Sequence, residues 1–181
     1  GMLPFYLSGS IDSLTNAFFE TMSGFTTTGA TILDDIESLS HGMLFWRSLT
    51  QWIGGLGIVF FTIAVLPVFT SGGVQLFSAE STGVTHDRTH PKINVMAKWL
   101  WTVYLILTLA ETILLMLGGM SLFDAVCQSF ATTATGGYST KQASISYWNS
   151  PFIEYVVAIF MLLSGVNFAL FLMCLRGKVS R

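Results

Sequence analysis

The sequence predicts an all-α integral membrane protein, organised as span–pore helix–filter–span repeats with three full transmembrane helices and two re-entrant segments. Of its 181 residues, 52% are hydrophobic and only 10% are charged, whereas a soluble domain typically carries about 25% charged residues. So few charges cannot cover the surface of a soluble globule. Two classes of apolar run, one long and one short, complete the prediction.

The long class consists of three runs that can each cross a bilayer core, which takes about 20 residues. They are residues 43–69, 95–117 and 152–175. Each is too long for an ordinary strand and too apolar for a surface helix. The sequence therefore predicts three transmembrane helices.

The short class consists of residues 11–25 and 122–132, and apolar stretches of this length are more often re-entrant than spanning. Each opens with residues that favour a helix N-terminus. These are Ser10 and Asp12 in the first segment, and Ser121 and Asp124 in the second. Each then enters a Thr/Gly-rich stretch, where β-branched Thr and permissive Gly should end the helix and let the chain continue extended.

The two short segments belong to an internal repeat. Aligning Gly29 with Gly136, 107 residues apart, also superimposes Thr28 on Thr135. Because Gly136 and Gly137 are adjacent, Gly29 can be aligned with either glycine, and the register of the second copy is open by one residue. We expect about one and a half units. Residues 1–70 form the second half of repeat one, residues 71–92 a loop, and residues 93–181 repeat two.

The distribution of Lys and Arg predicts the orientation. One face would carry six of them: Arg88, Lys92, Lys98, Arg176, Lys178 and Arg181. The face of the Thr/Gly stretches would carry only Arg47 and Lys141. Cytoplasmic segments are enriched in Lys and Arg. We therefore expect loop 71–92 and the C-terminus in the cytoplasm of a multi-pass inner-membrane protein, with the Thr/Gly stretches facing outside.

The Thr/Gly stretches have the composition of a carbonyl-lined ion filter. Irregular backbone at membrane depth is tolerated only when buried in protein or lining a wet cavity, and extended carbonyls can replace the hydration shell of a monovalent cation. The candidate ion-binding residues are Thr26, Thr27, Thr28, Gly29 and Ala30, and Thr133, Ala134, Thr135, Gly136 and Gly137. The alternative interpretation is a pair of polar turns between membrane helices. The repetition of the pattern favours an ion filter.

Three blocks of sequence resemble the Trk/Ktr/HKT potassium transporter family, most closely its bacterial members. Residues 18–31, FFETMSGFTTTGAT, resemble the first filter region of that family, and residues 45–57, FWRSLTQWIGGLG, resemble the following span. Residues 129–140, SFATTATGGYST, resemble the second filter. The resemblance covers nearly the whole chain.

The resemblance implies four repeats around one pore, with Gly29 and Gly136 as two of its four filter glycines. It implies potassium as the transported substrate. In the plant branch serine at the first filter position goes with sodium transport, whereas this sequence has Gly29 at that position. It also implies no cofactor, a homodimer, and a cytosolic nucleotide-binding regulatory subunit. A sodium-permeable or sodium-coupled relative and a non-conducting membrane scaffold or regulatory subunit are the alternatives.

Two carboxylates are further candidates. Glu20, within the first short helix, would support the filter from behind. Glu111, inside the second long run, would line a path, carry a proton or bond to a buried neighbour, because a carboxylate at this depth is costly and is a functional hypothesis by default.

Enzymatic activity and nucleic-acid binding are not expected. His86 and His90 have the spacing of a zinc pair, but Pro91 follows and no third ligand is evident. A solvated loop is the better interpretation, and a metalloprotease the remote one. No metal beyond a monovalent cation is expected. The net charge of −2 and the scattered basic residues give no nucleic-acid footprint.

Overall fold

The computed structural model describes residues 1–57 and 89–165, and these residues form helices and no strands. The elements are α1 (Leu3–Leu7), α2 (Leu14–Phe25), a helix of residues 41–57, α4 (Thr89–Leu117), α5 (Leu122–Thr133), the 3-10 helix η1 (Ser144–Trp148) and α6 (Pro151–Gly165). The predicted all-helical class agrees with this description.

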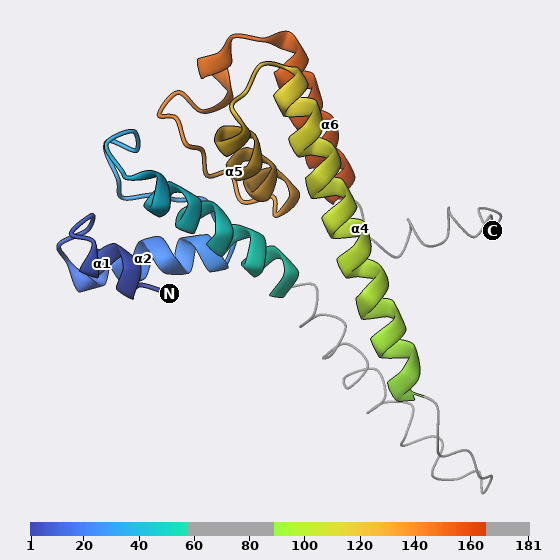
Figure 1. The fold of residues 1–181 in the computed structure, drawn as a ribbon. Coiled ribbons are helices and arrows are strands. Elements are labelled where there is room, and N and C mark those ends of the chain that lie inside the picture. Colours follow the sequence, from blue (N-terminus) through green and yellow to red (C-terminus); the bar gives the residue numbers. More distant parts are fainter. Residues whose placement is uncertain (58–88, 166–181) are drawn as a thin grey trace, which may run out of the picture.

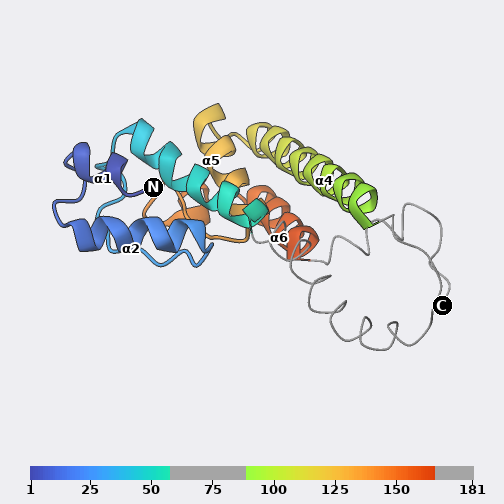
Figure 2. The same ribbon diagram turned by 90° about the horizontal axis from the view of Figure 1, so that it is seen from below.

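The helices form two groups that meet at α5 (Figures 1 and 2). The 41–57 helix lies beside α2, and α6 lies beside α4. The short helix α5 packs against both α4 and α6. It reaches the 41–57 helix through Phe130, whose ring stacks on Trp52 at a centroid distance of 5.0 Å. The two groups of helices therefore share one interface at α5.

The predicted second span coincides with α4. Within α4, Leu100–Leu117 is long and apolar enough to cross a bilayer, and no other helix in the described ranges reaches that length. The helix begins at Thr89, so it extends back into the segment assigned to the loop. The predicted first span beyond residue 57, most of the loop (residues 71–88) and the third span beyond residue 165 lie outside the described residues, as does the side chain of His90.

The N-terminus of α5 was predicted from local signals, and its capping geometry agrees. The Ser121 hydroxyl accepts a hydrogen bond from the Asp124 backbone N at 3.1 Å and donates to the Asp124 carboxylate at 2.8 Å. This reciprocal pair satisfies a helix N–H that has no partner within the helix. The helix ends at Thr133, one residue beyond the predicted end.

The start of α2 was predicted three residues too early. It begins at Leu14 after Ser13, whose side chain makes no capping hydrogen bond. Ile11 is instead held by the preceding segment, since its backbone N donates to Phe5 O at 3.2 Å and its side chain is buried beside Phe5. The short helix α1, which the sequence pattern did not reveal, thus determines where α2 starts.

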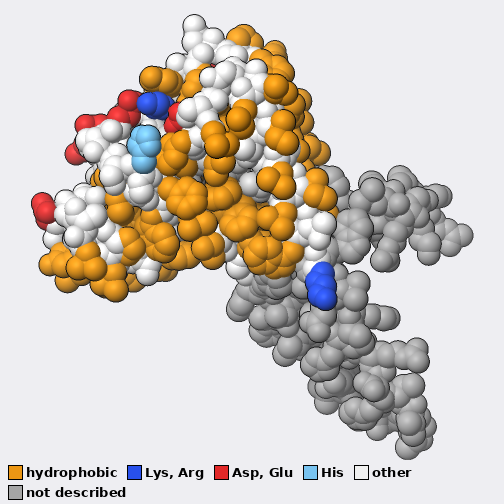
Figure 3. Space-filling view, viewed as in Figure 1, with side chains coloured by type: hydrophobic (Ala, Val, Ile, Leu, Met, Phe, Trp, Pro, Cys, Tyr) orange, Lys and Arg blue, Asp and Glu red, His pale blue; other side chains and the backbone are white. Residues whose placement is uncertain are grey.

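Each group has its own apolar core. The first core contains Phe5, Ile11, Ala17, Ile36, Leu39, Met43 and Leu44, and the second contains Leu115, Met120, Ala125, Ile153, Val156, Val157 and Phe160. Large hydrophobic side chains also face outward, and five of these on α4 are Leu105, Ile106, Leu109, Ile113 and Leu117. The face in Figure 3 is largely hydrophobic; acidic side chains and one basic side chain lie along its left edge, and another basic side chain lies at the lower right. An apolar surface of this breadth is typical of contact with lipid or with other protein segments.

Candidate ion filter site

The backbone repeats itself more closely than the side chains do. Both α2 and α5 have 12 residues, and the second helix lies 108 residues after the first. In the first stretch Thr27 and Gly29 have φ angles of 54° and 76°. In the second, Thr135 and Gly137 have φ angles of 54° and 84°. The structural equivalent of Gly29 is therefore Gly137.

The sequence alignment of Gly29 with Gly136 was thus wrong by one residue. It maximised shared Thr and Gly letters, whereas the backbone is fixed by where each helix ends. The three residues after α2 donate their N–H groups to Met22 O, Gly24 O and Ser23 O, at 2.9, 3.0 and 3.0 Å. The three residues after α5 donate to Phe130 O, Thr132 O and Ala131 O, at 3.2, 2.9 and 2.8 Å. These two sets match residue by residue only with the 108-residue shift.

This turn directs N–H groups back to the helix end and leaves carbonyl groups free. Within the described ranges, no hydrogen bond engages the carbonyl oxygens of residues 26–29 or of residues 134–137. Unpaired carbonyls normally need water, an ion or another partner. Eight of the ten predicted filter residues thus occupy equivalent positions with free carbonyls.

The other two predicted filter residues, Ala30 and Thr133, are placed differently. The carbonyl oxygen of Ala30 accepts hydrogen bonds from the Ser23 hydroxyl at 2.5 Å and from the Tyr138 hydroxyl at 3.3 Å. Thr133 is the last residue of α5, and its buried hydroxyl donates to Ser129 O at 2.6 Å. Ala30 therefore lies at the bonded end of the first stretch, and Thr133 belongs to the helix.

Glu20 forms a buried ion pair behind the first stretch. Its side chain is 0% exposed, and its Oε1 lies 2.9 Å from Nε of Arg47, which is 1% exposed. The same carboxylate accepts hydrogen bonds from the Thr31 hydroxyl at 2.9 Å and from Ile32 N at 3.2 Å. Both oxygens are therefore satisfied, as a buried charge requires. Glu20 thus links α2, the 41–57 helix and the segment that follows the filter stretch.

Arg47 extends this network to the second stretch. Its guanidinium lies 4.1 Å from the ring centroid of Tyr138, and its Nη1 lies 3.5 Å from Ser139 O. Its Nη2 donates to Thr31 at 3.3 Å. The Lys and Arg distribution in the sequence predicts Arg47 only as a charge on the face of the Thr/Gly stretches. The four-residue spacing of Arg47 from Gln51, which places both long polar side chains on one face of a largely apolar helix, was the signal for a shared buried role.

Gln51 lies one helical turn after Arg47 and also contacts the second stretch. Its side chain is 0% exposed, and its Oε1 accepts a hydrogen bond from Tyr138 N at 3.1 Å. A Cβ at Gly136 would collide with this amide group. The 41–57 helix, which follows the first stretch, therefore supports the second.

The helix α5 is also held by hydroxyl groups of α4. Thr112 and Ser129 hydrogen-bond through their hydroxyls at 2.7 Å, and the Thr108 hydroxyl lies 3.4 Å from that of Thr133. Trp52 Nε1 donates to the Thr108 hydroxyl at 3.1 Å, so the first repeat joins the same network. Hydroxyl bonds of this kind are a common means of joining helices in membranes.

Glu111 lies in this seam between α4 and α5 and away from the Glu20 ion pair. Its side chain is 0% exposed, and its carboxyl group lies beside the Thr132 and Thr133 hydroxyls. Both of those hydroxyls donate to helix carbonyls, of Gln128 and Ser129. Within the described part of the chain, neither oxygen of Glu111 has a hydrogen-bond partner.

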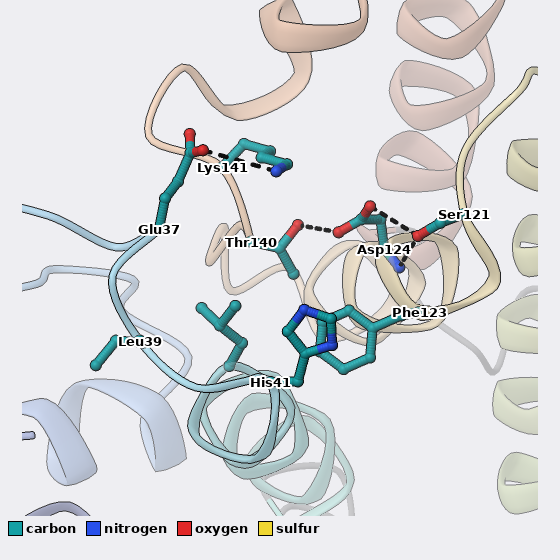
Figure 4. Close-up of a pocket in the computed structure, with 9 residues that line it drawn as sticks. Glu37, Leu39, His41, Ser121, Phe123, Asp124, Thr140 and Lys141 are labelled. Atoms are coloured by element: carbon teal, nitrogen blue, oxygen red, sulfur yellow. Dashed lines mark hydrogen bonds and ion pairs between the residues drawn. The ribbon is translucent and has the colours of Figure 1, made fainter.

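A small pocket lies between the segments that follow the two stretches, and residues of both segments line it (Figure 4). Its volume is about 140 Å³. Glu37 pairs with Lys141 at 3.7 Å, the Thr140 hydroxyl donates to Asp124 at 2.6 Å, and His41 stacks on Phe123 at 4.5 Å. Among the residues that the structure describes, no group of three or more His, Cys, Asp or Glu could hold a metal ion.

Comparison with known proteins identifies relatives of this chain. The family profile described as "TrkH: Cation transport protein" matches residues 2–180. The Trk system potassium uptake protein TrkH of Escherichia coli K12 is 47% identical over 180 residues, which are 98% of this chain and 37% of that protein. The Trk system potassium uptake protein TrkG of the same organism is 40% identical over 164 residues, 90% of this chain and 34% of that protein.

A solved structure is also similar. The crystal structure of the potassium transporter TrkH from Vibrio parahaemolyticus matches with a TM-score of 0.79 and 41% identity, covering 94% of this chain and 33% of that one. The chain spans about 37% of the length of the curated E. coli relative it matches. The profile match over nearly the full length, together with these identities, shows that the chain belongs to the TrkH family of cation transport proteins, whose membership implies a membrane location.

Proposed function

We propose that this chain forms part of a potassium uptake pathway, in which the free carbonyls of residues 26–29 and 134–137 coordinate the ion. The observation that carries this proposal is the repeated backbone: two stretches of different sequence share the same φ signs, the same helix-end hydrogen bonds and the same unengaged carbonyls. Neither stretch contains a charged side chain. Carbonyl dipoles, rather than a carboxylate ring, would therefore select the ion.

The two pore-type helices add to the electrostatics. Each stretch follows a helix C-terminus, which carries a partial negative charge of roughly half an elementary charge in the macrodipole picture. That end favours a cation next to the first carbonyl of the stretch. Several adjacent weak sites, rather than one tight site, would let the ion leave again.

Glu20 and Arg47 would hold the filters rather than touch the ion. Both side chains are buried and bonded to each other, so neither presents a free charge. Glu111 would likewise serve the packing of α5 against α4, because it is buried between helices while Thr135 and Gly137 of the second stretch are exposed. Ala30 would position the stretch through its bonded carbonyl.

The relatives suggest how the pathway is completed. They are more than twice as long as this chain and are named as potassium uptake proteins. We infer that further repeats supply the remaining filters around one pore, in a multi-pass inner-membrane protein with the filters facing outside. A homodimer and a cytosolic nucleotide-binding regulatory subunit complete the proposal.

The test is rubidium uptake into vesicles by the full-length protein, with sodium as competitor, for the native protein and for Gly29→Ser. The control is Gly119→Ser, because Gly119 has a φ of 99° but lies in the turn between α4 and α5. Both substitutions place a side chain at a positive φ. Gly29→Ser adds a collision of its Cβ with Gly136 O in the proposed filter, whereas a Cβ at Gly119 meets nothing within 4 Å.

Saturable rubidium uptake that resists sodium in the native protein and in Gly119→Ser, but not in Gly29→Ser, would support the proposal. Equal selectivity in all three proteins would refute the role of Gly29. Absence of uptake by the correctly folded native protein would favour a scaffold instead.

A further inference from the structure

The side chain of Tyr138 starts in the second repeat and ends inside the first. Tyr138 is 3% exposed, and its hydroxyl lies 3.0 Å from Glu20 O and 3.3 Å from Ala30 O. These two carbonyls belong to α2 and to the end of the first filter stretch. A phenol has one hydrogen to donate, so the two carbonyls share it.

Residues of the first repeat also hold the rest of this tyrosine. The Arg47 guanidinium covers the ring at 4.1 Å from its centroid, and Gln51 accepts the hydrogen bond of the Tyr138 backbone N at 3.1 Å. An aromatic ring under a guanidinium is attracted electrostatically as well as packed. The hydroxyl, the ring and the backbone of one residue are therefore each fixed by the other repeat.

The first repeat has no tyrosine equivalent to Tyr138 that reaches into the second repeat. With the 108-residue shift, the equivalent of Tyr138 is Ala30, whose methyl group cannot reach across. The Ala30 carbonyl instead receives two donors, Ser23 from its own repeat and Tyr138 from the other. This carbonyl closes the stretch whose four preceding carbonyls are free.

We propose that Tyr138 is a positioning residue for both filters: its hydroxyl fixes the separation of the two stretches and thereby sets discrimination between potassium and sodium. This inference rests on the proposed function of the stretches. A carbonyl site distinguishes monovalent cations either by its dimensions or by the field of its dipoles, and both depend on the spacing of the carbonyls. A stretch released at Ala30 can follow a smaller ion inward.

The experiment compares Tyr138→Phe with the native protein and with Tyr147→Phe, all in the full-length transporter. The substitution removes one oxygen and keeps the ring under Arg47. Tyr147 is 53% exposed on η1, so the same change there serves as the matched control. We expect the ratio of rubidium to sodium uptake to fall about fivefold in Tyr138→Phe, the factor that one ordinary hydrogen bond supports, and to stay at the native value in Tyr147→Phe.

A double-mutant cycle separates positioning from general stability. Ser23→Ala removes the other donor to the same carbonyl. The effects of Ser23→Ala and Tyr138→Phe on the uptake ratio should be non-additive, because both act on Ala30 O. If Tyr138→Phe fails to fold, Ser23→Ala alone still tests the proposal, because it should also lower the ratio of rubidium to sodium uptake.

The outcomes distinguish this inference from the proposed function. Native uptake with an unchanged ratio in Tyr138→Phe would overturn the role of Tyr138 and leave the potassium pathway standing. Absence of native uptake would refute the pathway. The cycle would then be measured on thermal denaturation of the purified protein in potassium and in sodium: coupled effects that differ between the two ions would still support the positioning role of Tyr138, and additive effects would overturn it.

Discussion

The first and second Thr/Gly stretches, the two proposed filters, have the same backbone but are held by different chemistry. Behind the first lies a buried ion pair, Glu20 with Arg47, with no solvent exposure to screen it. The second is held mainly by neutral groups, the amide of Gln51 and the hydroxyls that join α4 to α5. The guanidinium of Arg47 reaches it only over the Tyr138 ring and at Ser139 O. The positive φ angles and helix-end hydrogen bonds are nonetheless shared.

This difference indicates that backbone geometry, rather than any particular side chain, is what the two stretches have in common. An ion pair and a set of hydroxyls are not interchangeable when one member is removed, however. A buried charge that loses its partner is far costlier than a hydroxyl that loses one. The two halves should therefore respond differently to substitution.

The largest effect should follow from Arg47→Met. The substitution leaves Glu20 charged and buried, and breaking a buried pair in this way typically costs about 3–5 kcal/mol. Thermal denaturation of the purified full-length protein should show a large loss of stability. The double variant Arg47→Met with Glu20→Gln should recover part of it, because no lone charge remains.

Lys141→Met provides the control for that prediction. Lys141 pairs with Glu37 at 3.7 Å at the pocket of Figure 4, where both side chains are partly exposed. Exposed pairs contribute about 0–1 kcal/mol. Equal losses for Arg47→Met and Lys141→Met would show that burial of the Glu20 pair is not what matters.

Alanine at the two equivalent glycines should separate backbone strain from crowding. A left-handed conformation costs a non-glycine residue about 1–2 kcal/mol, and this applies to both Gly29 and Gly137. At Gly29 the added Cβ would also collide with Gly136 O, whereas at Gly137 it meets nothing within 4 Å. Gly29→Ala should therefore be clearly less stable than Gly137→Ala in thermal denaturation. The reverse order would contradict the contact between the stretches.

The sequence was most informative where structure depends on near neighbours. The Ser121 and Asp124 pair marked the start of α5, and the apolar length of α4 marked the second long helix, because both signals lie within the element they define. The start of α2 was missed because it depends on a contact between Ile11 and α1. The one-residue error in aligning Gly136 arose because letters were matched instead of helix ends.

The support of the site was the least predictable part. Glu20 and Arg47 are 27 residues apart, and Tyr138 reaches a carbonyl 118 residues away. No periodicity relates such positions. The filter residues themselves could be proposed from composition and repetition, whereas the contacts that hold them required the packing of two repeats.

A smaller effect is expected from Thr112→Val, which removes the 2.7 Å hydroxyl pair with Ser129. Hydrogen bonds between membrane helices contribute about 0.6 kcal/mol on average, so the loss of thermal stability should be modest. The control is Thr102→Val, since among the described residues the Thr102 hydroxyl donates only to Lys98 O of its own helix. A loss as large as that of Arg47→Met would show that the second stretch is not held by independent neutral contacts.

The smallest effect should come from Glu111→Gln, and it contrasts the two buried carboxylates. Glu20 accepts three side-chain and backbone donors, so Glu20→Gln should destabilise the protein. Glu111 has no hydrogen-bond partner within the described ranges, and its amide substitute can donate to the lone pairs of the Thr132 and Thr133 hydroxyls. We expect Glu111→Gln to change the free energy of unfolding by less than Thr112→Val does, because the amide gains hydrogen bonds and no hydrogen bond of the carboxylate is lost within the described residues. If Glu111→Gln instead lost as much thermal stability as Glu20→Gln, a partner outside the described residues would have to bind this carboxylate, and the neutral character assigned to the second repeat would be wrong.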